Sequence, residues 1–116
     1  MTQMLITTGE RAHLLANGEA RVAAQDTDPL PVVRLFTPDA HATWLLVSLD
    51  PEDSDTAYGL IDLGIGMPEL GHVTLSDLES IVGPRQQPVT RDRYFTAART
   101  LSDYVRLAQA NGSIVD

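Results

Sequence analysis

Apolar residues follow the spacing of strands through the middle of the chain. Three runs rich in β-branched and aromatic residues, at 32–36, 43–49 and 57–63, predict strands, and a shorter strand is expected at 72–75. The run at 43–49 is apolar almost throughout, which predicts burial on both of its faces. Short polar links separate the runs, so we expect antiparallel pairing that begins with a hairpin of the first two strands.

A capping box at Thr7 and Glu10 predicts a first helix over 9–16, because each side chain accepts a hydrogen bond from the backbone of the other residue. The Asn-Gly pair at 17–18 then predicts the end of this helix, since glycine adopts the left-handed conformation that stops helices. The segment 19–25 is compatible with a helical turn or with a connector.

Two further helices are predicted toward the C-terminus. A Ser/Glu capping box predicts a short helix over 76–82. A second helix is expected over 100–110, where a hydroxyl cap opens the segment and Asn-Gly at 111–112 closes it. Between the two helices, the alternating segment 89–95 predicts an extended edge segment.

These elements predict a single domain over residues 1–116 of the α+β class, in which a small, mostly antiparallel sheet is flanked by short N- and C-terminal helices. The chain has no cysteine, which excludes disulfides and thiolate metal sites. It has no lysine either, which excludes Schiff-base chemistry and a P-loop lysine. The first residues lack the features of a signal peptide and no run is long enough to span a membrane, so we expect a cytoplasmic protein.

Charge is distributed unevenly along the chain, whose formal net charge is −8. Residues 1–25 are neutral, residues 26–79 carry eleven acids against one arginine for a net of −10, and residues 80–116 carry five arginines against three acids for +2. An excess of carboxylates opposes binding to phosphate groups, so direct nucleic-acid binding is not expected. A charge of this size also keeps an ordinary small domain in solution.

The acidic run at 50–55 is the first feature with chemical potential, because hard cations prefer clustered oxygen ligands. It does not fit an EF-hand loop. A loop that starts at Asp53 would have Tyr58 and Gly64 where glycine and glutamate are required, and one that starts at Asp50 would have Asp55 and Ile61. The run therefore predicts a solvated loop.

Acidic side chains nevertheless suggest one sharper function. Carboxylates at alternate positions of an extended chain are spaced like the phosphates of a nucleic-acid strand to within about a factor of two. An acidic surface of this kind can occupy a channel that normally holds DNA or RNA.

Glycines at 64, 66 and 71 resemble a phosphate-binding loop, but the third glycine has the wrong spacing and no long helix follows. We expect a tight turn with positive φ at one or both of Gly64 and Gly66.

The Arg-rich segment is the only basic and aromatic patch. Three uses stay open for it: contact with an acidic partner, contact with the end of a nucleic acid, and pairing with the acidic middle of the chain, which is the expected one. The patch consists of Arg85, Arg91, Arg93 and Arg99, with Tyr94 and Phe95 between them.

Three histidines lie on a predicted helix, a loop and a strand, at His13, His41 and His72. No two of them have the spacing of a helical zinc site. They would form a metal or acid–base site only if the fold brought them together with a carboxylate. The candidates for that role are Asp39, Asp62 and Glu69.

Several motifs resemble a known family of small bacterial proteins, domain of unknown function 2958. The likeness extends over most of the chain and has no assigned activity attached to it. Family members tend to be encoded on plasmids, integrative elements and phages, which implies a role in element maintenance or in countering host defence. The chain departs from the family pattern at Ser48, where an acid is usual, and at His72, where an aromatic residue is usual. The matching motifs include Thr43-Trp44, Tyr58-Gly59-Leu60-Ile61-Asp62-Leu63-Gly64, Glu69-Leu70-Gly71, Ser76-Asp77-Leu78-Glu79 and Arg91-Asp92-Arg93-Tyr94-Phe95.

The acidic middle and this resemblance together lead us to expect a non-enzymatic accessory protein of mobile elements that binds a protein partner. The expected partner is a host defence nuclease or CRISPR effector, inhibited by imitation of nucleic acid, and no cofactor is expected. Two alternatives stay open. One is a small metal-dependent enzyme or metal-binding module that uses His41, His72, Asp62 and Glu69, and the other is a subunit of a larger assembly. The residues expected to contact the partner are Asp50, Glu52, Asp53, Asp55, Asp62, Glu69, Arg91 and Arg93.

Overall fold

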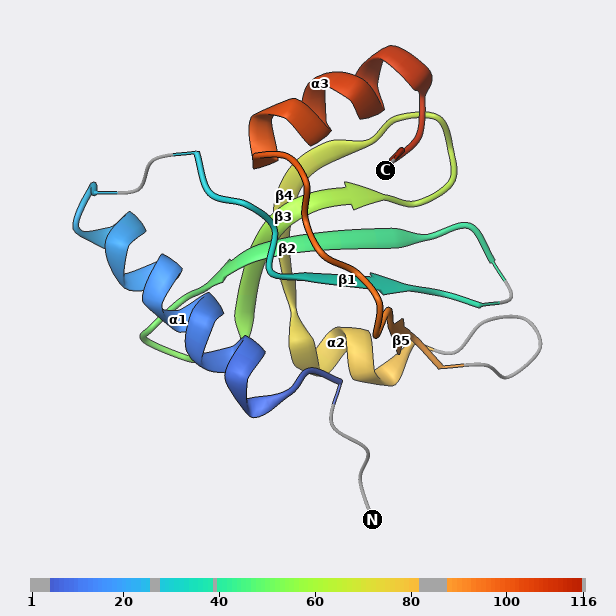
Figure 1. The fold of residues 1–116 in the computed structure, drawn as a ribbon. Coiled ribbons are helices and arrows are strands. Elements are labelled where there is room, and N and C mark those ends of the chain that lie inside the picture. Colours follow the sequence, from blue (N-terminus) through green and yellow to red (C-terminus); the bar gives the residue numbers. More distant parts are fainter. Residues whose placement is uncertain (1–4, 26–27, 39, 82–87, 116) are drawn as a thin grey trace.

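The computed structural model describes residues 5–25, 28–38, 40–81 and 88–115, and it contains a five-stranded antiparallel sheet (Figure 1). The strand order is β4-β3-β2-β1-β5, and every neighbouring pair is antiparallel. This arrangement confirms the predicted α+β class. The strands are β1 (Val33–Phe36), β2 (Thr43–Leu49), β3 (Thr56–Asp62), β4 (Glu69–Thr74) and β5 (Thr90–Arg91), and the helices are α1 (Thr8–Val22), α2 (Leu75–Ser80) and α3 (Leu101–Asn111).

The two faces of the sheet carry separate apolar clusters. On one face, α1 and α2 contribute Leu14, Leu75 and Leu78 to a cluster with the sheet residues Leu35 and Trp44. On the other face, α3 packs its buried side chains against β2 and β3. That second cluster contains Leu45, Val47, Leu60, Leu101, Tyr104 and Ala108. Because both faces are covered, the central strand β2 is buried along nearly its whole length, as its apolar sequence predicts.

An irregularity in β2 sets which side chains face which cluster. The register with β3 passes from Leu46 directly to Ser48, so Val47 is an extra residue in a β-bulge. Val47 packs in the cluster beneath α3, whereas Leu49 packs in the cluster beneath α1. Without the bulge, strict alternation would have placed these two residues on the same face.

The Asn-Gly pair in α1 docks the helix on this bulge and does not end it, so the predicted helix end is wrong. Asn17 Nδ2 donates a hydrogen bond to the carbonyl oxygen of Val47 at 2.8 Å. A Cβ atom on Gly18 would lie 1.8 Å from the carbonyl oxygen of Leu49, so only glycine permits this approach of helix to strand. The helix continues to Val22, which settles the ambiguous segment 19–25 largely in favour of helix.

The boundaries around β4 and α2 also differ from those predicted. Strand β4 begins at Glu69, three residues before the predicted start at 72. Thr74 caps α2 by accepting from the Asp77 backbone N–H at 3.1 Å, so the helix starts before the predicted Ser76 cap. Ser76 bonds to Asp55 and does not cap the helix. The predicted end at residue 82 lies outside the described residues.

Helix α3 is capped from a distant part of the chain. Thr100, the predicted cap, makes no capping hydrogen bond with its side chain. Asp28 accepts from the Ser102 backbone N–H at 2.9 Å and from the Ser102 hydroxyl, and these bonds lower the pKa of Asp28. The other end of α3 is as predicted, because Gly112 adopts the left-handed conformation with φ of 75°. Of the predicted extended segment 89–95, only β5 pairs as a strand.

Among the helices in the described part of the chain, none combines the length and the apolar character that crossing a membrane requires.

Candidate functional site

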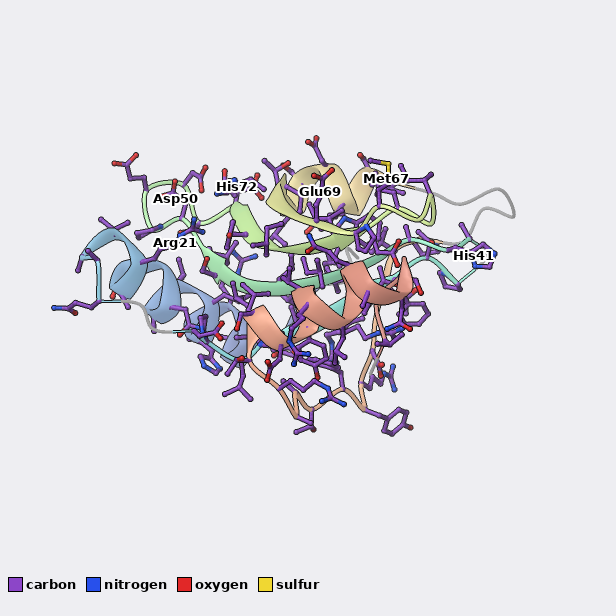
Figure 2. The ribbon with its side chains drawn as sticks, turned by 90° about the horizontal axis from the view of Figure 1, so that it is seen from above. Arg21, His41, Asp50, Met67, Glu69 and His72 are labelled. Carbon is purple, nitrogen blue, oxygen red and sulfur yellow. The ribbon has the colours of Figure 1, made fainter. Side chains whose placement is uncertain are left out.

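Acidic side chains gather along one edge of the sheet because of the strand order. Strands β3 and β4 come from the acidic middle of the sequence, whereas β5 comes from the arginine-bearing end, and β4 and β5 are the two outermost strands. Figure 2 shows Asp50, His72, Glu69 and Met67 spread along the β4 side of the molecule. We call the following set the acidic edge: Asp50, Glu52, Asp53, Asp55, Glu69, Asp77 and Glu79.

The loop between β2 and β3 is folded by its own carboxylates. Asp50 accepts from the Glu52 backbone N–H at 2.9 Å, an Asx turn. Asp53 accepts from the backbone N–H groups of Asp55 and Thr56 and from the Thr56 hydroxyl, at 2.9, 3.0 and 2.6 Å. Glu52 is exposed. The predicted solvated loop is therefore also an ordered one, and its shape places carboxylates outward.

Asp55 joins this loop to helix α2. Its carboxylate accepts from the Ser76 backbone N–H at 3.1 Å and from the Ser76 hydroxyl at 2.7 Å. The Leu75 N–H also donates to the Asp55 carbonyl at 2.9 Å. These bonds hold the start of α2, and with it Asp77, beside the acidic loop.

We expect Asp53 to titrate with a pKa of about 2, below its ordinary value of 3.8, because the bonds from Thr56 and Asp55 favour the charged carboxylate. A lowered pKa means that the contribution of Asp53 to stability is present above pH 3.8 and is lost as the pH falls through 2. A titration followed by NMR at the side-chain carboxyl carbon measures this value. In Thr56→Val the midpoint should rise toward 3.8, and a wild-type midpoint at or above 3.8 would contradict the hydrogen-bonding account.

Asp62 does not belong to the exposed surface, although the sequence placed it among the partner contacts. Its side chain is 4% exposed, and its two oxygens accept from the backbone N–H groups of Gly64 and Ile114 at 2.9 and 3.0 Å. The carboxylate thus ties the end of β3 to the segment after α3. Glu69, by contrast, is exposed at the start of β4.

Arg34 and Arg91 lie toward the β5 side of the sheet, whereas Arg11 and Arg21 lie beside the acidic edge. The prediction that Arg91 pairs with the acidic middle is wrong. Arg91 pairs with Glu10 of α1 at 3.4 Å. Arg34, from β1, pairs with Asp92 at 3.1 Å. Arg93 is exposed. Arg85 lies outside the described residues, so the predicted patch is described only in part.

The histidines do not converge. His41 lies in the β1–β2 hairpin and His72 on β4, and Figure 2 shows them far apart on the molecule. His13 is exposed on α1. Within the ranges that the structure describes, no three His, Asp or Glu side chains gather in an arrangement able to hold a metal ion. Asp39 lies outside those ranges.

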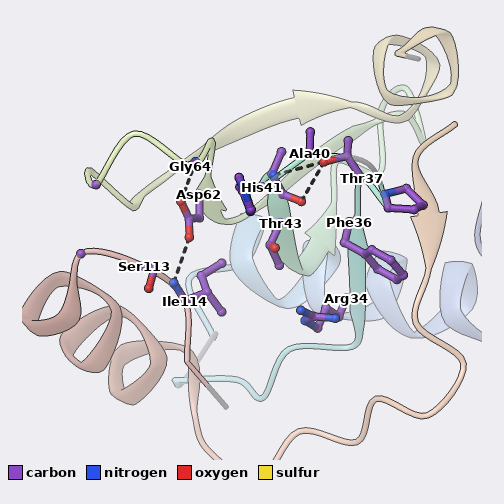
Figure 3. Close-up of a pocket in the computed structure, with 14 residues that line it drawn as sticks. Arg34, Phe36, Thr37, Ala40, His41, Thr43, Asp62, Gly64, Ser113 and Ile114 are labelled. Carbon is purple, nitrogen blue, oxygen red and sulfur yellow. Dashed lines mark hydrogen bonds between the residues drawn. The ribbon is translucent and has the colours of Figure 1, made fainter. Parts of the chain in front are cut away.

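A pocket of about 530 Å³ opens where the glycine turn meets the β1–β2 hairpin (Figure 3). Gly64 and Gly66 have φ values of 79° and 80°, so the predicted tight turn with positive φ is confirmed at both positions. Arg34 and Asp62 line the pocket, but the first is paired with Asp92 and the second is held by backbone N–H groups. Both charges serve the fold, and the exposed His41 is the remaining titratable side chain among the described residues that line the pocket.

A stacked group of three side chains, which the sequence does not predict, lies on the same face of the sheet as this pocket but at the opposite end. The Arg21 guanidinium carbon lies 3.6 Å from the centroid of the Tyr58 ring, and the Tyr58 and His72 rings are 4.9 Å apart at their centroids. Ser48 and His72 line one cavity of about 260 Å³ here, together with Asp50. The stack was not predicted because Arg21 lies beyond the expected end of the first helix.

An antiparallel sheet with helices on both faces and acids along one edge defines an α+β protein whose candidate site is an open surface. The chain belongs to the family described as "Protein of unknown function (DUF2958)", whose sequence profile matches residues 5–115. The expected family is thereby confirmed. Searches of curated proteins and of solved structures return no match to the chain.

Proposed function

We propose that this chain is a non-enzymatic accessory protein of mobile genetic elements that binds a protein partner through the acidic edge. The partner is a host nuclease or CRISPR effector, and the acidic edge occupies the positively charged surface that such a protein offers to nucleic acid. Inhibition of the anti-CRISPR or anti-restriction type follows from that occupation.

The observation that carries the proposal is the separation of charge across the sheet. Glu52, Glu69, Asp77 and Glu79 are exposed on the β4 side, while the arginine pairs with Glu10 and Asp92 lie at or near the β5 side. Arg11 and Arg21 also lie beside the acidic edge, where Arg11 donates to the Ser54 carbonyl at 2.9 Å and Arg21 stacks on Tyr58. The seven carboxylates of the edge remain in excess over these two charges. A surface of one sign attracts a partner of the opposite sign and repels nucleic acid itself.

The test compares two double variants with the same change in net charge. Glu52→Gln with Glu79→Gln removes two of the seven charges of the acidic edge, and Glu19→Gln with Asp103→Asn removes two acidic charges elsewhere. The immobilised wild-type protein is used to recover partners from a host lysate, and each partner is then purified and titrated. We expect a basic, nucleic-acid-binding partner whose affinity falls about fivefold in the edge variant and little in the control.

Competition provides the second readout. Duplex or single-stranded DNA should displace the chain from its partner if the two share a surface, and raised salt should weaken binding. A partner that binds the edge variant as tightly as wild type, or that binds DNA and this chain simultaneously, would rule out the proposal.

A further inference from the structure

Strand β4 leaves one backbone edge of the sheet without a partner among the described residues. It is the terminal strand in the sheet order, and it pairs with β3 over all six of its residues without a register shift. Alternate residues of an outer strand point their N–H and C=O groups away from the sheet. Such an edge is a template for another strand unless a proline, a bulge or an inward-pointing charge blocks it. Pro68 precedes β4 and none lies within it.

The hairpin that leads into β4 exposes large apolar side chains. Leu63, Ile65 and Met67 are 57, 70 and 68% exposed, and Leu70 at the start of β4 is 41% exposed. They lie close together in sequence on the β3–β4 hairpin, held by the turn at Gly64 and Gly66. An exposed apolar group of this kind, rimmed by polar residues, is typical of an interaction surface.

The opposite end of β4 is acidic. Thr74 pairs with Thr56, which follows the acidic loop, and Asp55 of that loop bonds to Ser76. Asp77 follows on α2. Glu69 places one exposed carboxylate at the hairpin end. The unpaired edge therefore has a mainly apolar end at the hairpin and an acidic end at α2, roughly 20 Å apart for a six-residue strand.

We propose that β4 accepts an extended segment of the partner as a sixth strand, antiparallel to β4. In that direction the N-terminal half of the segment lies beside Asp55 and Asp77 and carries Lys or Arg. Its C-terminal half lies beside Ile65 and Met67 and carries apolar side chains. Main-chain hydrogen bonds supply the affinity, and the two ends of the edge supply the selectivity. This mode of binding rests on the proposed function, because it assigns the same acidic edge a basic partner.

A second copy of the chain fits the edge less well than a basic partner. Two copies each carry a formal charge of −8, so they repel one another at long range. A segment rich in Lys or Arg gains from the same charge.

Synthetic peptides test the strand directly. The probe is Lys-Arg-Lys-Arg-Thr-Val-Thr-Ile-Thr-Val with blocked ends, and the control is the same peptide in reverse order. Binding to the isotope-labelled protein is followed by NMR, with hydrogen exchange of the β4 amides as the structural readout. We expect the probe to bind at least about fivefold more tightly than its reverse and to protect outward-facing amides of β4.

Two N-methylated forms of the probe separate strand addition from simple charge attraction. One is methylated at every odd amide and the other at every even amide, so both keep the same charge and apolar side chains. A peptide strand donates to β4 from only one of these sets. The affinity of one form should fall at least about tenfold, while the other form should keep the affinity of the unmethylated probe. Equal binding by both forms, or by the reversed peptide, overturns the strand proposal.

Two further results distinguish this proposal from the proposed function. If partner binding still depends on Glu52 and Glu79 but both methylated peptides bind, the acidic edge stands and strand addition fails. If the protein alone forms a dimer at micromolar concentration that protects the β4 amides, a second copy occupies the edge and the partner-strand proposal is overturned. The double variant Ile65→Ser with Met67→Ser should bind the probe about fivefold more weakly than the wild-type protein does. Its affinity for the reversed peptide should be unchanged.

Discussion

Replacing Gly18 with alanine is expected to destabilise the protein by about 3 kcal/mol or more, although alanine favours helices over glycine. The added Cβ would lie 1.8 Å from the carbonyl oxygen and 2.9 Å from the carbonyl carbon of Leu49. These are backbone atoms of the central strand, so no change of side-chain rotamer relieves the overlap. Helix α1 would have to move away from β2, which would also stretch the hydrogen bond from Asn17 to Val47.

The matched control is Gly9→Ala in the same helix. Nothing lies within 4 Å of a Cβ at Gly9, so this substitution should leave stability unchanged or raise it by up to about 1 kcal/mol. Chemical denaturation of both variants, analysed with a common slope, gives the comparison. A Gly18 variant as stable as the Gly9 variant would show that helix and strand do not approach as closely as described.

Replacing Asp62 with alanine is expected to cost about 2–4 kcal/mol, the second largest effect. The buried carboxylate accepts from the backbone N–H groups of Gly64 and Ile114, and both donors lose their partner when the side chain is shortened. Since Ile114 packs against the cluster beneath α3, release of this segment should also loosen that cluster.

Asp62→Asn provides the intermediate case. Its amide oxygen replaces one acceptor, while its NH₂ group faces the remaining N–H donor. Stability should therefore fall in the order wild type, Asn, Ala. Hydrogen exchange at the amides of Gly64 and Ile114 should accelerate in the alanine variant more than exchange in α1 does. Uniform acceleration throughout the chain would assign the loss to general destabilisation.

Local signals were sufficient for most of the elements. The strand at 43–49 was predicted with its observed bounds, because a long apolar run between turns allows few alternatives. The turn at Gly64 and Gly66 was predicted because little else than glycine adopts positive φ at both positions. The acidic loop was predicted because polar turn-forming residues rarely pack in a core.

Contacts between distant segments account for the errors. An Asn-Gly pair is a common helix end, but here a bulge thirty residues later provides the carbonyl that Asn17 needs. The burial of Asp62 depends on a backbone N–H fifty-two residues away. Arg91 pairs with Glu10, which the sequence places in the neutral N-terminal part. No local pattern reports on such pairings, which arise only when the sheet is assembled.

The excess of carboxylates on the β4 side of the sheet gives the molecule an electric dipole in the plane of that sheet. A positively charged body that comes within a Debye length, about 8 Å at physiological salt, exerts a torque on that dipole and turns the β4 side toward itself before contact. Fewer encounters are then lost to wrong orientations. Salt should consequently slow the association of this chain with a basic partner more than it hastens dissociation.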